Sequence, residues 1–200
     1  LSFDRKSDGY ISAIQIAKLL LLNYRPDVRS GSSNSIAILF DMNKLWEEYI
    51  YRMLQKANDG TLVIHNQRSA KFWSNQSNHR YLKPDIVIER AHVTGEKEYV
   101  VIDTKWKNIY SEVKNVSMDD LRQMFAYHHY FDAVKCYLLF PGADNLQEGN
   151  FTKESYFKKN NLGEKACGII ISQAWVSKEN KGFLNKDIGI NVLNTLNLLN

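Results

Sequence analysis

Two short segments, YLKPDIVIE at residues 81–89 and YVVIDTKWK at residues 99–107, decide how this 200-residue chain folds. Each contains the run of apolar and β-branched residues that is typical of a strand, and the turn-like segment VTGEK lies between them. We therefore predict that the two segments pair as a β-hairpin. Strands normally exclude charge from their apolar runs, so the presence of Asp85, Asp103 and Lys105 beside and within them needs a reason.

The spacing of these charged residues indicates one shared site. Side chains on a strand alternate between two faces, so Asp103 and Lys105 project from one face and Thr104 from the other. In the predicted hairpin, Asp85 approaches Asp103 from the neighbouring strand. Two adjacent carboxylates repel each other, and a bound Mg²⁺ would remove that cost. The pattern Asp/Glu-x-Lys also occurs elsewhere in the chain, and a surface salt bridge of Lys105 is the alternative interpretation.

Two predicted helices supply further candidates. A helix is expected over residues 35–57, where apolar residues recur at helical spacing and Glu47 falls among them. A buried carboxylate needs a partner or a metal, although a glutamate at the edge of the apolar face, reaching water, is the alternative. On a second helix, expected over residues 118–131, Gln123 and Tyr127 lie on one side at positions i and i+4. They could orient the lysine and contact a phosphate, or serve only in helix packing.

The rest of the chain completes an α/β pattern. We expect further helices at 10–23 and from 187 to the end, and further strands at 61–65, 134–141 and 167–175. The segment 141–165 is expected to be a polar loop with at most a short helix. This order predicts a mixed sheet covered by helices.

Composition narrows the class of protein. With 44% hydrophobic residues the chain can bury a core, and its net charge of +4 is compatible with a polyanionic partner. Cys136 and Cys167 lie in apolar runs and are predicted to be reduced core residues, with a disulfide or a metal role as the alternative. The apolar run at 13–22 is too short to span a bilayer, and no basic leader precedes it, so we expect a cytoplasmic protein without membrane contact. Because the chain begins with Leu1 rather than Met, we expect that an upstream region is missing.

Several motifs resemble those of a nuclease family. The residues PD at 84–85, DTK at 103–105 and QMFAY at 123–127 are similar to the PD-(D/E)xK nuclease motif in its QxxxY subgroup. Together with DMNKLWEEYI at 41–50, they resemble the nuclease domain of McrC, the cleaving subunit of modification-dependent McrBC-type restriction systems. The resemblance covers about residues 36–140.

The resemblance implies a fold for part of the chain. It implies a PD-(D/E)xK restriction-endonuclease-like α/β core, a mixed central sheet flanked by helices, at residues 36–140. Outside that span the division rests on the sequence patterns alone: we expect a nuclease domain at 35–200, with a C-terminal extension at 141–200, and an N-terminal helix and loop at 1–34 that could be the end of a truncated upstream region.

The resemblance also implies a cofactor and a role for each site residue. The cofactor is Mg²⁺, for which Mn²⁺ can substitute. The implied metal ligands are Asp85, Asp103 and the Thr104 backbone carbonyl, with Glu47 in support. Lys105 would orient or activate the attacking water and stabilise charge at the scissile phosphate. Gln123 completes the site, and Tyr127 matches the motif.

A basic and aromatic segment precedes the first of these motifs. No acidic residue occurs between Asp59 and Asp85, and basic residues are interleaved there with aromatic ones. This combination suits a surface that follows a DNA backbone, while a solvated loop with a few buried aromatic residues is the alternative. The predicted contacts to double-stranded DNA are Arg68, Lys71, Trp73, Arg80, Lys83 and Lys107.

These observations favour one function and leave alternatives. The sequence contains no GxxxxGK[ST] motif, so we do not expect the chain to hydrolyse a nucleotide. The resemblance instead implies a McrB-like AAA+ GTPase subunit as partner, without which this chain would cut weakly or not at all. The predicted function is a metal-dependent DNA endonuclease, the cleaving subunit of a McrBC-like complex. The alternatives are another PD-(D/E)xK nuclease, of repair or transposition, and a catalytically silent DNA-binding or assembly module.

Overall fold

The structure is a computed structural model, and it describes residues 41–91, 95–151, 166–178 and 181–199. The chain divides into two compact units, residues 1–40 and 41–200, and all described residues belong to the second. The helix predicted at 10–23, the N-terminal segment 1–34 and the first residues of the helix predicted at 35–57 lie outside the described residues.

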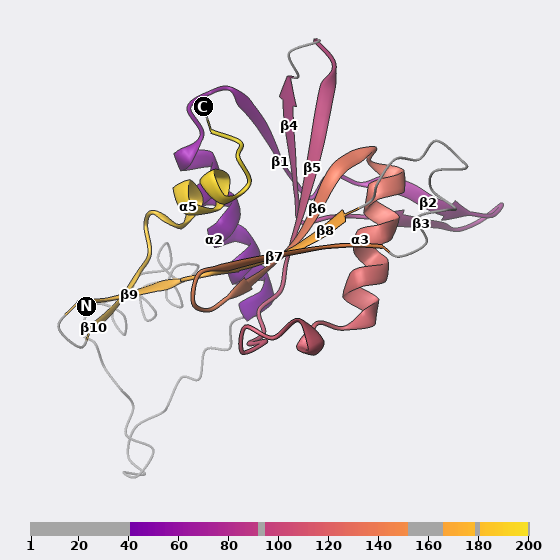
Figure 1. Ribbon diagram of the computed structural model, residues 1–200. Helices are drawn as coiled ribbons and strands as arrows, with labels where there is room; N and C mark the ends of the chain where they lie inside the picture. Colours follow the sequence, from indigo (N-terminus) through magenta and orange to yellow (C-terminus); the bar gives the residue numbers. More distant parts are fainter. Residues whose placement is uncertain (1–40, 92–94, 152–165, 179–180, 200) are drawn as a thin grey trace, which may run out of the picture. The chain divides into compact units, whose positions relative to one another are not determined.

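A mixed six-stranded sheet forms the centre of this unit, in the order β1-β4-β5-β6-β8-β7 (Figure 1). Strands β5, β6 and β8 run parallel to one another, and the other pairings are antiparallel. The predicted hairpin is confirmed as β4 paired with β5, with Ile86 opposite Ile102. The strands are β1 (Leu62–Asn66), β4 (Ile86–Ala91), β5 (Lys97–Thr104), β6 (Ala133–Pro141), β7 (Asn145–Asn150) and β8 (Ala166–Ser172).

Helices cover both faces of this sheet, because the β-strands bury apolar side chains on both sides. The helices are α2 (Met42–Ala57), α3 (Met118–Tyr130) and α5 (Ile188–Thr195), with a 3₁₀ turn, η2, at Val113–Asn115. Val100 and Ile102 of β5 pack with α2 and α5, whereas Val101 packs with α3. The predicted α/β fold, a mixed sheet flanked by helices, is confirmed. Among the described residues, no helix has both the length and the apolar character needed to cross a membrane.

The structure corrects the prediction for the segment 81–89, which is not one strand. Strand β3 (His79–Leu82) ends before Lys83, and β4 begins only at Ile86. Pro84 interrupts the strand because it has no backbone N–H to donate to a ladder. β3 pairs instead with β2 (Ala70–Ser74) as a separate two-stranded sheet, which the sequence patterns do not predict.

One strand, β7, lies where the sequence predicts a loop. β7 lies within the region 141–165, and its residues, NLQEGN, lack the apolar alternation that identifies a strand. As an edge strand it pairs on one side only, with β8, and most of its side chains remain exposed. A further hairpin, β9 (Trp175–Lys178) with β10 (Lys181–Leu184), follows β8.

The two cysteines are free and buried, which confirms the prediction that they are reduced core residues. Cys136 of β6 lies opposite Cys167 of β8 in the parallel register. Burial raises the pKa of the Cys167 thiol to about 12, so this thiol is protonated at neutral pH.

Gly189 sets how closely α5 approaches α2, and its replacement is expected to destabilise the protein. A Cβ atom at Gly189 would lie 2.0 Å from the backbone oxygen of Met53, so Gly189→Ala would force the two helices apart. We expect a loss of about 1–3 kcal/mol in the free energy of unfolding. Chemical denaturation measures it, and Gly149→Ala is the control because open space surrounds that position. Equal stability of the two variants would contradict this packing.

Candidate functional site

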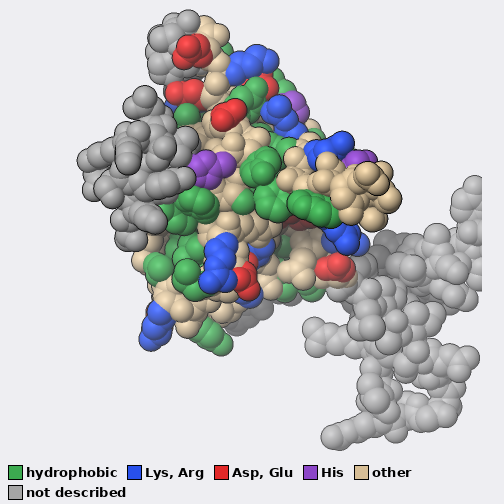
Figure 2. All heavy atoms as spheres, turned by 90° about the vertical axis from the view of Figure 1, so that its right-hand side faces the viewer, with side chains coloured by type: hydrophobic (Ala, Val, Ile, Leu, Met, Phe, Trp, Pro, Cys, Tyr) green, Lys and Arg blue, Asp and Glu red, His purple; other side chains and the backbone are tan. Residues whose placement is uncertain are grey.

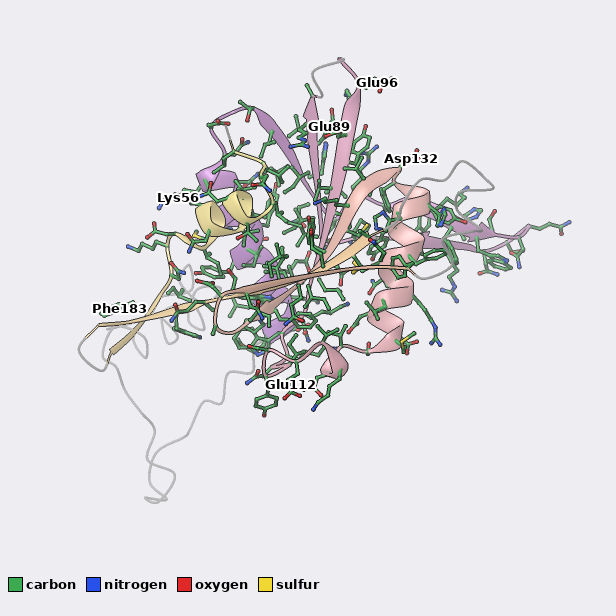
Figure 3. All side chains as sticks on the ribbon, viewed as in Figure 1. Lys56, Glu89, Glu96, Glu112, Asp132 and Phe183 are labelled. Atoms are coloured by element: carbon green, nitrogen blue, oxygen red, sulfur yellow. The ribbon has the colours of Figure 1, made fainter. Side chains whose placement is uncertain are left out.

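The predicted site residues meet where β5 ends and β4 begins. Asp103 and Thr104 are the last residues of β5, Lys105 follows them, and Asp85 directly precedes β4. Because Ile86 lies opposite Ile102, the antiparallel register brings Asp85 next to Asp103. Asp103 is only 2% exposed. Figure 3 shows other acidic residues, such as the labelled Glu96 at the tip of the β4–β5 hairpin, at the periphery of the fold.

Helix α3 completes a closed set of contacts around Lys105. Lys105 Nζ lies 2.6 Å from Asp103 Oδ2 and donates a 3.1 Å hydrogen bond to Gln123 Oε1. Gln123 Nε2 donates to the Tyr127 hydroxyl at 2.7 Å, and that hydroxyl donates to Asp103 Oδ1 at 3.5 Å. The i, i+4 spacing of Gln123 and Tyr127 makes this arrangement possible. The amide of Gln123 thus fixes the position of the lysine.

The burial of Asp103 makes its carboxylate unusual. Burial, followed by the charge of Asp85, raises the pKa of Asp103 to about 6. Lys105 Nζ forms an ion pair with Asp103 Oδ2 at 2.6 Å, and this pair opposes the upward shift in the pKa of Asp103 without cancelling it. Burial alone would lower the pKa of Lys105, but Asp103 and the neighbouring carboxylates together raise it. The lysine is therefore a cation at neutral pH, facing an oxygen that can accept a further positive charge.

Asp85 is held by the end of the neighbouring strand. Its Oδ2 accepts hydrogen bonds from the Thr104 amide at 2.7 Å and from the Thr104 hydroxyl at 2.8 Å. For Thr104, the sequence analysis predicts only that its backbone carbonyl binds the metal. The hydrogen bonds from its backbone N–H and its hydroxyl to Asp85 are not predicted. They orient the Asp85 carboxylate and leave its other oxygen without a contact from Thr104.

Glu47 of α2 joins the site through a residue that sequence reasoning misses. Gln67, which follows β1, donates from its side chain to Glu47 Oε1 at 2.6 Å and from its backbone to the Asp85 carbonyl at 2.8 Å. Burial raises the pKa of the half-buried Glu47; the Gln67 hydrogen bond opposes this shift and the charge of Asp85 adds to it. Gln67 adopts a left-handed conformation, with φ of 51°, which the type of residue does not reveal.

Asp120, in the first turn of α3, is a second residue that the sequence does not single out. Its carboxylate lies 3.5 Å from Lys105 Nζ and 2.5 Å from Lys107 Nζ. The only signal in the sequence is the acidic start of this helix. Lys107, predicted to contact DNA, is therefore paired with Asp120, and its ammonium also lies 5.6 Å from the centre of the Phe140 ring.

The chemistry of these residues fits a hard divalent cation. Carboxylate oxygens are the ligands that Mg²⁺ prefers, and the carboxylates of Asp85 and the buried Asp103 lie close enough that the charge of Asp85 raises the pKa of Asp103. Within the described part of the chain, however, no three His, Cys, Asp or Glu side chains are gathered closely enough to hold a metal ion. In the structure, Thr104, Lys105 and Gln67 contact the carboxylates of Asp85, Asp103 and Glu47, respectively.

Most of the predicted DNA contacts lie on the surface beside this site. The exposed residues Arg68, Lys71, Arg80 and Lys83 belong to β2, β3 or the segments that flank them, and the Trp73 side chain is 51% exposed. The guanidinium of Arg68 lies 5.0 Å from the centre of the Tyr99 ring. Figure 2, which views this side, shows Lys and Arg side chains interspersed with hydrophobic ones.

Gln123 gives the site its first test. Gln123→Leu keeps the size of the side chain but removes both of its hydrogen bonds, so the lysine loses its fixed position. We expect a fall of about 10–100-fold in the rate of any reaction at this site, with little change in melting temperature. The matched control is Gln55→Leu, because Gln55 also donates to a tyrosine hydroxyl four residues away, on α2. An equal effect of the two substitutions would contradict a role for Gln123.

Comparisons with known proteins agree with the fold. The family described as McrBC 5-methylcytosine restriction system component matches residues 1–141. A chain from the refined half-complex of a tetradecameric assembly of Thermococcus gammatolerans McrB AAA+ hexamers with bound McrC is similar to this chain, with a TM-score of 0.55 and 18% identity. That alignment covers 98% of this chain and 40% of the other, so this chain spans about two-fifths of that length.

A second solved structure shows a weaker similarity. It is the crystal structure of AF1548, a protein of unknown function, with a TM-score of 0.35 and 16% identity over 76% of this chain and 64% of that one. No curated protein matches the chain.

Proposed function

Because this chain belongs to the family of McrBC 5-methylcytosine restriction system components, we propose that it is the DNA-cleaving subunit of such a system, a Mg²⁺-dependent endonuclease. The observation that supports this most is the group of Asp85, Asp103 and Lys105 at the end of one hairpin, with Gln123 and Tyr127 fixing the lysine. A surface salt bridge would not need a buried carboxylate beside a second one, nor an amide that orients the ammonium.

The cation would be held by the acidic residues of the site. Asp85, Asp103 and the Thr104 carbonyl are the proposed ligands, and Glu47 supports them. Mn²⁺ would also bind in place of Mg²⁺. A bound ion of this kind lowers the pKa of its water and neutralises charge on the phosphate. Asp103 and Asp85 would hold the cation, and its positive charge would offset the repulsion between these two carboxylates, which burial intensifies.

Lys105 is the proposed catalytic cation. In the hydrolysis, a water oxygen bonds to phosphorus and the water releases a proton, while one ester P–O bond breaks and the leaving oxygen takes up a proton. The ammonium of Lys105, held by Gln123 and Asp103, would orient the water and stabilise the charge that develops on the phosphate. Tyr127 stays a neutral phenol, because burial and the charge of Asp103 raise its pKa. Its role is to position Gln123 and Asp103.

The proposed substrate is double-stranded DNA, and the proposed partner is a McrB-like AAA+ GTPase. Arg68, Lys71, Arg80 and Lys83 are exposed cations that suit phosphate contacts. Lys107 has a smaller part in this proposal, because Asp120 already pairs with it. The similar solved assembly joins McrC to McrB AAA+ hexamers. By analogy, we propose that a motor subunit presents DNA to this chain.

The test is cleavage of supercoiled plasmid DNA, with and without a McrB-like AAA+ GTPase. We expect nicked or linear product in Mg²⁺ or Mn²⁺, no product in EDTA, and more product with the partner and GTP. Cleavage that persists in EDTA would contradict metal dependence. Absence of cleavage under every condition, with the partner present and hydrolysing GTP, would favour the silent assembly module.

A further inference from the structure

The β2–β3 hairpin has the features of an element that enters the DNA itself. Its two strands form a sheet of their own, and Figure 1 shows them projecting from the side of the unit where α3 lies. Every side chain from Lys71 to Tyr81 is exposed, on both faces of the ribbon. A ribbon exposed on both faces cannot serve as a layer of the core, and it can therefore be surrounded by a partner.

The base of this hairpin is anchored at the proposed site. The ribbon begins just after Gln67 and ends at Lys83. The backbone N–H of Gln67 donates a hydrogen bond to the backbone carbonyl of Asp85 at 2.8 Å. Ala70 and Leu82 pack against the core on the α3 side, and the Phe72 ring lies 5.1 Å from the ring of Tyr130 at the end of α3. Any DNA that binds the ribbon is consequently held at a fixed position relative to Asp85.

The composition of the ribbon matches DNA in charge and shape. It contains Lys71 and Arg80 and no acidic residue. Trp73 lies opposite Arg80, and Tyr81 lies opposite Lys71, so these two exposed rings are each paired across the strands with a cation. Cations bind phosphates, and aromatic rings contact sugars and bases.

The tip of the ribbon is a stiff turn rich in amides. Asn75 Oδ1 accepts hydrogen bonds from the backbone N–H groups of Ser77 and Asn78. The backbone N–H of Asn75 donates to the backbone carbonyl of Asn78. This network leaves Gln76 and Asn78 exposed at the end of the ribbon. Asn and Gln pair with the N6 and N7 edge of adenine in the major groove, which is wide enough to admit a two-stranded ribbon.

We propose that the β2–β3 ribbon inserts into the major groove of duplex DNA beside the cleaved phosphate, with Gln76 and Asn78 at the base edges and Trp73 against the backbone. This inference rests on the proposed function, and it specifies where on the DNA the chain binds. It makes the ribbon a determinant of DNA affinity that is separate from the metal and from the catalytic residues.

The test measures binding without cleavage, so that it does not depend on catalysis. The full chain is titrated against a fluorescent duplex in EDTA, and anisotropy gives the dissociation constant. Trp73→Ala should weaken binding about 10-fold. The matched control is Trp175→Ala, on the β9–β10 hairpin, because Trp175 is 52% exposed and Trp73 is 51% exposed. Both rings are exposed, so neither substitution should lower the melting temperature.

A second arm identifies the groove. A duplex that contains 7-deazaadenine lacks the N7 acceptor of adenine in the major groove. We expect the unsubstituted chain to bind this duplex more weakly than the ordinary duplex. A variant that combines Gln76→Ala with Asn78→Ala should bind the two duplexes equally. Equal affinities of Trp73→Ala and Trp175→Ala would overturn the proposal, as would preference for single-stranded DNA, insensitivity to 7-deazaadenine, or failure of the chain to bind duplex. Intact, ribbon-dependent binding without cleavage would instead contradict only the nuclease proposal.

Discussion

Asp103→Asn is expected to abolish metal-dependent cleavage of DNA, to less than about one-thousandth of the original rate. The substitution keeps the shape of the side chain but removes the charge that would bind the cation and pair with Lys105. Plasmid cleavage measures the effect. Asp119→Asn is the control, because Asp119 is an exposed residue of α3 whose ion pair with Arg122 lies at the surface. Cleavage by Asp103→Asn at the rate of the control would remove Asp103 from the mechanism.

The same substitution is expected to stabilise the protein when no metal is added. The pKa of Asp103 rises from 3.8 to about 6 on folding, so the folded state favours the neutral form. Stability is therefore lost as the pH rises from 3.8 to about 6, and the loss persists above that range. At pH ~8, Asp103→Asn should gain on the order of 1–3 kcal/mol in the free energy of unfolding. Thermal denaturation in EDTA measures this gain, which should vanish below pH ~4.

Lys105→Met is expected to separate metal binding from catalysis. The methionine keeps an unbranched side chain but removes the ammonium, so we expect cleavage to fall about 100–1,000-fold. Because Lys105 would no longer compete for Asp103 Oδ2, the affinity for Mn²⁺ should be kept or increased. Calorimetry and plasmid cleavage on the same preparation measure the two effects.

The control for Lys105→Met is Lys97→Met, on the same strand. Lys97 also forms an ion pair, 2.6 Å from Glu89, but at the surface and at the far end of β5. We expect its cleavage rate to match that of the unsubstituted chain. A Lys105→Met variant that cleaves as fast as this control would contradict the proposed role of the lysine.

The parts of the fold that the sequence predicts are those governed by local patterns. The β4–β5 hairpin follows from two apolar runs around a turn, and α3 follows from apolar residues at helical spacing after an acidic start. The hairpin register brings Asp85 to Asp103, so the centre of the site is also predictable from the sequence. The motif residues on α3 then face Lys105 because of their i, i+4 spacing.

The parts that are missed depend on tertiary contacts. β7 is polar, and it becomes a strand only because β8 offers it an edge. Gln67 reaches Glu47 through a left-handed turn, and Asp120 reaches Lys105 and Lys107 because α3 docks at the end of β5. None of these contacts leaves a periodic signal, since each joins residues that are distant in sequence or adopts an unusual backbone conformation.

The most direct test of the account is the binding of Mn²⁺ to this chain, measured by titration calorimetry. Cleavage depends on DNA and on a partner, whereas the proposed metal ligands, Asp85 and Asp103, belong to this chain alone. We predict a saturable heat of binding for the unsubstituted chain and for Asp119→Asn, and its loss in Asp103→Asn. Absence of binding by the unsubstituted chain, or equal binding by all three proteins, would contradict it.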